Sequence, residues 1–348
     1  MKSTIKKILM SYIPFACKKY LFKCKLYLRE PKLLLLANSK YRTNAPTLLL
    51  LSFPRSGSSW VGSILGTGEH VRYLREPVTT SYTLQKKHRI SVFDKTTCDN
   101  WNEYQSYIDK SLHGSANFSS SIIKFTKQWL KPHLKKTLVI KEVNPLVIDN
   151  YLSKPIKLVY LVRHPFSVAK SYSALNWQPT EVFSNKFNKA TLNTLQQITP
   201  NLLQQSFWFQ MGYLQGWVEA TVKREISVAP KKNKAIILVR YEDICREAES
   251  EFIKLFSFAN LPFTEKVSSA ITNSLKRKEK VSAGDFSLTR SKEDIETIKV
   301  NTNEQENYHE LMLAYHQAIL DFCQHQSPTI KNITPSFTLN SSLVKLLK

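Results

Sequence analysis

Cysteine is scarce in this 348-residue chain, and its five cysteines show no pairing pattern. They are Cys17, Cys24, Cys98, Cys245 and Cys323. None belongs to a Cys-x-x-Cys motif or to the Cys/His spacing of a zinc site, and no His-Glu-x-x-His sequence is present. An odd, widely spaced set of thiols argues against a disulfide framework and favours a reducing compartment. We therefore expect no metal site.

Long hydrophobic segments are also missing. The apolar stretch near the N-terminus, Ile8 to Cys17, spans ten residues and contains Pro14. A membrane-spanning helix needs about 20 apolar residues, and no small-x-small cleavage site follows this stretch. The sequence therefore predicts a cytoplasmic protein without a transmembrane helix or a cleaved signal peptide.

Acidic residues are outnumbered, with 27 Asp and Glu against 50 Lys and Arg, for a net charge of +23. Residues 1–44 hold 11 Lys and Arg against one acid, Glu30, a balance of +10. Because aromatic and aliphatic residues alternate with these lysines, we expect a basic amphipathic extension over residues 1–45. It either contacts an anionic membrane or docks on the folded domain. The charge favours anionic partners, but no zinc-finger, RNP-type or helix-turn-helix pattern supports nucleic acid.

The most informative stretch is Thr47–Leu65, TLLLLSFPRSGSSWVGSIL. Its apolar start predicts a buried strand, and the spacing from Trp60 onwards predicts a helix. The small-residue loop between them is typical of an anion site, because Gly57 lets the backbone approach and helix N-terminal N–H groups point at the ligand. Arg55 adds a planar donor for phosphate or sulfate oxygens. The alternative is an ordinary capped helix with a surface arginine.

The loop is not a Walker A sequence, because that motif needs a second glycine and a Gly-Lys-Ser/Thr ending. A second feature follows the clearest strand, Ile156–Val162. Pro165 suits the first turn of a helix, so Arg163 lies at the carboxyl end of the strand and Ser171 on the helix. Ligands bind at such strand ends in open parallel sheets, and the pair predicts a phosphate site.

A third feature is the tetrad Leu74-Arg75-Glu76-Pro77, which follows a strand beginning at Val71. A carboxylate at that sheet edge is placed to deprotonate an attacking hydroxyl. The alternative is a surface Glu76 paired with Arg75.

Strands and helices alternate along the chain, which predicts an α/β fold with a parallel sheet covered by helices. Further strands are expected at 137–140, followed by Lys141-Glu142, and at 235–239. Helices are expected at 201–224, 247–260 and 303–324, and residues 273–292 are expected to form a basic loop. The predicted domain covers residues 46–325, between the extension and a polar tail over 326–348.

Three segments, PRSGSSW, LVRHPFSVAKSY and VRYEDI, together resemble the sulfotransferases that use PAPS (3′-phosphoadenosine 5′-phosphosulfate). The branch is the carbohydrate type, as found in bacteria, and the resemblance covers residues 46–325. It implies a three-layer α/β/α fold like that of P-loop NTPases. It also implies transfer of a sulfuryl group from PAPS to a hydroxyl of a carbohydrate or glycolipid, without a metal.

The resemblance also assigns roles at matching positions. The residues that hold the 5′-phosphosulfate are Arg55, Ser56, Gly57, Ser58 and Ser59. Arg55 also stabilises charge on the transferring group, Trp60 stacks near adenine, and Glu76 is the base. Arg163 and Ser171 bind the 3′-phosphate, and Tyr241-Glu242-Asp243 is structural.

Two positions depart from the family pattern. His164 replaces the usual Asp, and Arg277-Lys278 lacks the glycine of the Arg-Lys-Gly segment that completes the 3′-phosphate site in soluble members. Two other functions remain open on the sequence: a nucleotide-dependent kinase with a degenerate phosphate loop, and a non-catalytic protein that binds anions or membranes.

Overall fold

The computed structural model describes residues 47–79, 101–114, 137–229, 235–276, 300–326 and 333–338, with a few single residues between 14 and 28. Most of the basic extension over residues 1–45, and the Arg277-Lys278 pair, lie outside the described residues. Within the described part, no helix combines the length and the apolar character needed to cross a bilayer.

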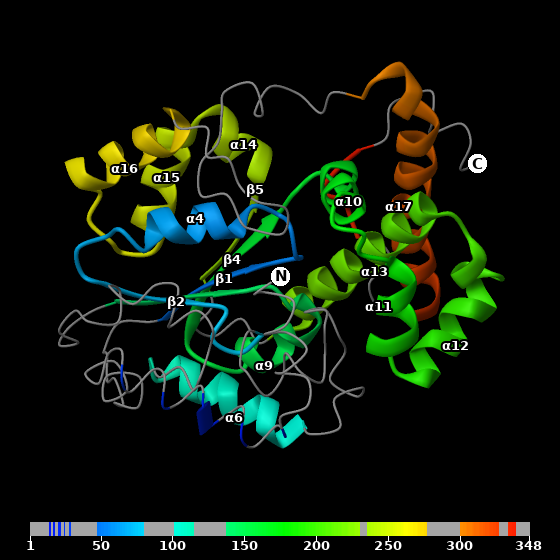
Figure 1. Ribbon diagram of the computed structural model, residues 1–348, viewed down its shortest axis with the longest axis horizontal. Coiled ribbons are helices and arrows are strands. Elements are labelled where there is room, and N and C mark those ends of the chain that lie inside the picture. Colours follow the sequence, from blue (N-terminus) through cyan, green and yellow to red (C-terminus); the bar gives the residue numbers. More distant parts are fainter. Residues whose placement is uncertain are drawn as a thin grey trace.

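A five-stranded parallel sheet forms the centre of the molecule (Figure 1). Its strands are β1 (Thr47–Ser52), β2 (Val71–Arg75), β3 (Thr137–Glu142), β4 (Ile156–Val162) and β5 (Ala235–Arg240), in the order β2-β3-β1-β4-β5. The four strands β1 to β4 are almost wholly buried. Near-continuous apolar runs are expected where helices cover both faces of a sheet.

Alternate residues of β1 point into two separate cores. Leu48 and Leu50 belong to one core, and Leu49 and Leu51 to the other. The first core lies beneath α4 (Ser58–Leu65), α14 (Tyr241–Arg246), α15 (Ala248–Phe258) and α16 (Glu265–Lys276). The second lies beneath α6 (Trp101–Leu112), α9 (Ile148–Leu152), α13 (Phe207–Val228) and α17 (Gln305–Gln326). The predicted three-layer α/β/α fold is confirmed.

The two long helices α13 and α17 pack closely because α13 carries glycines at the contact. A Cβ on Gly212 would lie less than 3 Å from the carbonyl oxygen of Leu311, and one on Gly216 would meet that of Tyr315 equally closely. The other helices among the described residues are α10 (Pro165–Ser173), α11 (Pro179–Lys186) and α12 (Lys189–Ile198), with short 3₁₀ turns η2 (Pro145–Val147), η3 (Leu202–Gln204) and η5 (Thr302–Glu304).

Several predicted boundaries were wrong. The helix expected from residue 201 begins only at Phe207, because the Ser206 hydroxyl accepts a hydrogen bond from the Phe209 N–H and caps it there. The basic loop expected over 273–292 starts inside α16, which continues to Lys276. Helix α14 begins at Tyr241, directly after β5, where no separate helix was expected.

Parallel strands place all their carboxyl ends at one edge of the sheet. The register pairs Leu51 of β1 with Glu142 of β3, and Val162 of β4 with Arg240 of β5. The segments that follow β1, β2, β3 and β4 therefore meet at this edge, and these segments carry the predicted site residues.

Candidate functional site

The loop after β1 has an unusual backbone. Arg55 and Gly57 both have positive φ angles, 71° and 85°. A hydrogen bond from the Ser56 N–H to the Phe53 carbonyl (3.3 Å) and one from the Trp60 N–H to the Gly57 carbonyl (3.0 Å) close the turn. Gly57 is the N-cap of α4, and no side chain caps this helix. The first-turn N–H groups are thus arranged as in an anion-binding loop.

Gly57 is required here for a second reason. A Cβ at this position would lie less than 3 Å from three ring carbons of Tyr241. The Tyr241 ring is buried and also contacts the edge of Trp60 and the guanidinium of Arg163, which lies 4.9 Å from the ring centroid. The Tyr241 ring therefore packs directly against Gly57 of the loop, which fits the structural role predicted for it.

Arg55, Arg163 and Ser171 come together, although they lie on two different connections. The Arg55 Nε donates to the Ser171 Oγ (2.8 Å), across 116 residues of sequence. The Arg163 Nη1 donates to the carbonyl oxygen of Arg55 (3.0 Å). The two predicted anion sites thus form one cluster, and the direct contact between Arg55 and Ser171 was not foreseen from the sequence.

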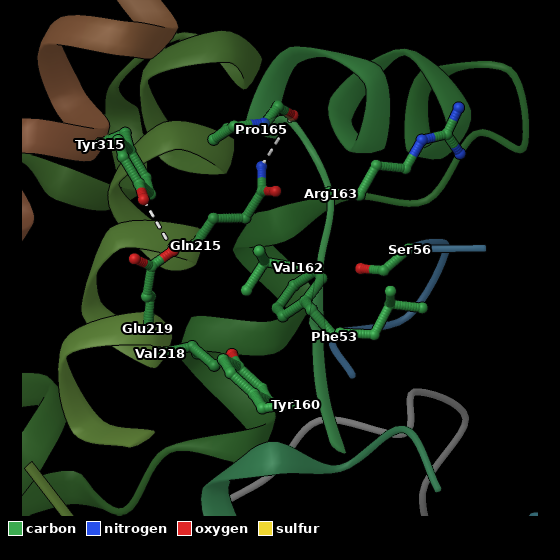
Figure 2. Close-up of a pocket in the computed structure, with 11 residues that line it drawn as sticks. Phe53, Ser56, Tyr160, Val162, Arg163, Pro165, Gln215, Val218, Glu219 and Tyr315 are labelled. Carbon is green, nitrogen blue, oxygen red and sulfur yellow. Dashed lines mark hydrogen bonds between the residues drawn. The ribbon is translucent and has the colours of Figure 1, made fainter. Parts of the chain in front are cut away.

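The three serines of the loop are buried. The Ser52 hydroxyl donates to the Ser58 Oγ (2.8 Å), and the Arg75 guanidinium donates to the Ser59 Oγ (3.4 Å). Ser56 lines a cavity of about 20 Å³ between β4 and α13, which Figure 2 shows with Gln215 and Glu219 on its far side. That volume suits a single water molecule.

Trp60 lies in the core. Its side chain is 0% exposed, its Nε1 donates to the Ser274 Oγ of α16 (2.9 Å), and its ring meets the ring of Phe252 edge-on at 5.5 Å. Stacking on adenine needs an exposed ring face. The predicted contact with adenine stays a prediction, and this burial argues against it.

Glu76 follows β2 at the same edge, with a φ of 49°. Its N–H donates to the Lys141 carbonyl (2.6 Å), and its carboxylate forms an ion pair with the Lys141 ammonium, while the Arg75 Nε lies 4.0 Å away. Burial lowers the pKa of Lys141, an effect that the Glu76 carboxylate opposes. Glu76 is therefore a buried member of a charged group, rather than the surface residue of the alternative interpretation.

Glu142, the next residue after Lys141, binds the segment that follows Glu76. Its carboxylate accepts hydrogen bonds from the Val78 N–H (2.7 Å), the Thr79 N–H (3.4 Å) and the Thr79 hydroxyl. Burial raises the pKa of Glu142 to about 7. From the sequence we predicted only a strand followed by two charged residues, Lys141 and Glu142. The position of this pair directly after an apolar run was the feature that could have indicated a buried role for Glu142.

His164 is the N-cap residue of α10. Its Nδ1 accepts a hydrogen bond from the Phe166 backbone N–H (3.3 Å), and the backbone N–H of His164 donates to the Glu242 carboxylate (2.9 Å). Burial, with Arg240 and Arg163 nearby, lowers the pKa of His164 to about 3. The ring is therefore neutral at physiological pH, and Glu242 ties α14 to the turn that carries Arg163.

The residues that the structure describes contain no cluster of three His, Cys, Asp or Glu side chains able to hold a metal ion. The carboxyl edge of the sheet thus combines a tight glycine-containing loop at a helix N-terminus, two arginines, a serine hydroxyl and a carboxylate paired with a lysine. Such a site suits transfer of an anionic group, which depends on positioning and electrostatic stabilisation.

Comparison with known proteins gives a consistent result. The sulfotransferase domain family matches residues 45–324, and no curated protein matches the chain. Among solved structures, the sulfotransferase domain from the curacin biosynthetic pathway is 14% identical, with a TM-score of 0.42, and the alignment covers 88% of this chain and 97% of that one. The sulfotransferase from Alicyclobacillus acidocaldarius is 12% identical, with a TM-score of 0.38 and coverage of 83% and 100%. Mouse sulfotransferase SULT7A1, complexed with PAP, is 15% identical, with a TM-score of 0.34 and coverage of 79% and 87%.

Proposed function

This chain belongs to the sulfotransferase family, and as a PAPS-dependent enzyme of that family we propose that it transfers the sulfuryl group to a hydroxyl of a carbohydrate or glycolipid. The observation that carries the proposal is the meeting of Arg55, Arg163 and Ser171 at the carboxyl edge of the sheet. PAPS has two anionic groups, and these residues supply donors for both.

Arg55 and the loop from Ser56 to Ser59 would hold the 5′-phosphosulfate. Backbone N–H groups in this loop and the first turn of α4 face an anion with the favourable end of the helix dipole. Arg163 and Ser171 would bind the 3′-phosphate. Because the Arg55 side chain donates to Ser171 in this structure, binding of the donor would replace that contact with bonds to the two anionic groups.

Glu76 would accept the proton of the acceptor hydroxyl as the hydroxyl oxygen bonds to sulfur, while the bond between sulfur and the 5′-phosphate oxygen breaks and adenosine 3′,5′-bisphosphate leaves. A general base must reach the proton that it removes and must be ionised. The Glu76 carboxylate forms an ion pair with the Lys141 ammonium. The Glu76-Pro77 pair, which resembles that of carbohydrate sulfotransferases, supports a sugar hydroxyl as the acceptor.

The first experiment is a calorimetric titration with PAP (adenosine 3′,5′-bisphosphate), adenosine 5′-monophosphate and ATP–magnesium, at low and high salt. We expect selective binding of PAP that persists at high salt. Preference for ATP–magnesium would instead support a kinase. Weak binding of all three that disappears at high salt would support a non-catalytic anion-binding protein, because such binding reflects net charge alone.

A pair of variants tests the 3′-phosphate assignment. Arg163→Ala should weaken PAP binding by about tenfold or more, since a hydrogen bond to a charged group contributes about 1.5–3 kcal/mol. Binding of the monophosphate should change little. Arg246→Ala is the matched control, because it removes the same charge from an exposed position on α14, beside Asp243. Equal losses for both nucleotides in Arg163→Ala would refute the assignment.

A glycolipid acceptor lies in a membrane, and the basic residues 1–44 would bring the enzyme to an anionic membrane surface. Sedimentation with vesicles that contain anionic lipid, compared between the full chain and a form in which lysines 2, 6 and 7 are replaced by Gln, measures that contact. Loss of sedimentation in the substituted form is the expected result; unchanged sedimentation would assign the binding to the folded domain.

A further inference from the structure

A short segment near the C-terminus returns to the domain after α17. Residues 333–338, ITPSFT, lie against α13, α17 and the end of β5, and Figure 1 shows them in red beside α10. Ile333 and Phe337 are buried, with exposed fractions of 9% and 3%. The expected polar tail over 326–348 thus contains a segment with two core side chains.

The segment is fixed by a buried carboxylate and a lysine of α13. The Ser336 N–H donates to the Glu219 Oε1 (2.8 Å), and the Lys223 Nζ donates to the Thr334 carbonyl (2.5 Å) and the Ser336 Oγ (3.0 Å). Glu219 is itself held by the Tyr315 hydroxyl (2.7 Å) and by Lys223 (2.7 Å). These bonds set the position of the next residue, Phe337.

Phe337 contacts the ends of both β4 and β5. Its ring meets the His164 ring at a centroid distance of 5.0 Å and an angle of 67°, and the Arg240 guanidinium lies 4.8 Å from its centroid. The His164 ring also stacks on Tyr308 of α17, with 5.8 Å between the ring centroids and 11° between the ring planes. The imidazole therefore contacts two aromatic rings.

His164 in turn fixes the two residues assigned to the 3′-phosphate. It follows Arg163 directly, and its Nδ1 caps α10, the helix that carries Ser171. A cap defines where a helix begins and hence the direction of its first turn. Displacement of the His164 ring would therefore move Arg163 relative to Ser171 and the loop.

We propose that Phe337 is a positioning residue for the donor site: it acts through His164 to hold Arg163 and Ser171 at the spacing that the 3′-phosphate of the nucleotide requires. This inference rests on the proposed function. Phe337 would thus act on the nucleotide site through a neighbouring residue, although it follows Ser171 by more than 160 residues of sequence.

The test compares Phe337→Ala with Ile333→Ala in the full-length chain. Both variants remove a buried side chain from the same segment, but of the two residues it is Phe337 whose aromatic ring meets the His164 ring. Titration with PAP and with adenosine 5′-monophosphate, together with thermal unfolding, is carried out on each. An aromatic pair contributes about 0.5–1.5 kcal/mol beyond burial, so we expect Phe337→Ala to weaken PAP binding about twofold to twelvefold.

The monophosphate should bind Phe337→Ala as it binds the unchanged protein, because it lacks the 3′-phosphate. Ile333→Ala should lose thermal stability while its PAP affinity stays unchanged. Equal weakening of PAP binding in both variants would overturn the proposal and leave the segment a general stabilising element. Full PAP affinity in a folded Phe337→Ala would overturn it as well.

Phe337→Leu keeps the apolar volume but removes the ring, and it answers the same question if Phe337→Ala does not fold. Failure of the unchanged protein to prefer PAP over the monophosphate would refute the proposed function, and this inference with it. Selective binding by the unchanged protein, combined with unaltered selectivity in Phe337→Leu, would refute this inference alone.

Discussion

Replacement of Gly57 by Ala tests the geometry of the loop after β1 most directly. The φ angle of Gly57 is 85°, in the left-handed region, where an L-residue with a side chain pays about 1–2 kcal/mol. The added Cβ would also overlap the Tyr241 ring, with three ring carbons closer than 3 Å. Overpacking of a buried site costs about 1–3 kcal/mol.

The two contributions together predict that Gly57→Ala lowers the free energy of unfolding by about 2–5 kcal/mol. Urea unfolding measures this value, and a double-mutant cycle with Tyr241→Ala separates the two parts. Removal of the ring should relieve the overlap but not the backbone strain. The loss caused by Gly57→Ala should therefore shrink by about 1–3 kcal/mol in the Tyr241→Ala background.

Gly114→Ala is a comparison at a second left-handed position, because Gly114 has a φ of 71° two residues after α6. The same loss for Gly57→Ala with and without the Tyr241 ring would refute the contact between ring and loop. A neutral effect of Gly57→Ala in both backgrounds would refute the left-handed conformation itself. We also expect the variant to bind PAP more weakly, since the loop N–H groups would be displaced.

Three further predictions concern other buried positions. Gly212→Ala should destabilise the protein by about 1–3 kcal/mol in urea unfolding, because its Cβ would meet the Leu311 carbonyl of α17; an unchanged midpoint would contradict the close packing of α13 and α17. Since burial raises the pKa of Glu142 from 4.5 to about 7, the folded protein retains a proton that the unfolded chain releases in that range. The unfolding free energy should therefore fall by up to about 3 kcal/mol, relative to Glu142→Gln, as the pH rises through this window; parallel pH profiles of the two proteins would contradict it. Lys141→Met leaves the buried Glu76 carboxylate without the ammonium that forms an ion pair with it, and should lower the free energy of unfolding by about 3–5 kcal/mol. Adding Glu76→Gln to this variant should restore part of that loss. An unchanged free energy of unfolding in Lys141→Met would show that the protein does not need the ion pair.

Strands β1, β3, β4 and β5 were predictable because each contains a short apolar run bounded by polar residues. The apolar runs at Leu48–Leu51 and Ile156–Val162 lie in β1 and β4, which are buried on both faces. The predicted ends of these two strands agree with the observed ends to within one residue. Pro165 at the first turn of α10 was a local signal of the same kind. Such features depend on neighbours within a few residues, which the sequence displays directly.

Helices with polar faces were harder to place. Residues 273–276 are Asn-Ser-Leu-Lys, which reads as loop, yet they end α16, whose Val267 and Ile271 pack into the core. Helix α14 is only six residues long and follows β5 without a connecting loop. Helix formation in these segments depends on an apolar surface that other parts of the chain supply.

The roles of single side chains also fall into two groups, those that local sequence predicts and those that depend on tertiary contacts. The sequence by itself determined the α/β class, the strand–turn–helix unit around Gly57, and the placement of Arg163 at a strand end, because each follows from local pattern and backbone chemistry. Only the tertiary structure decided that Trp60 is enclosed by α15 and α16, that Glu76 pairs with Lys141, and that Arg55 reaches Ser171. Strand order and register bring those groups together across 65 to 214 residues of chain, and local sequence does not contain either.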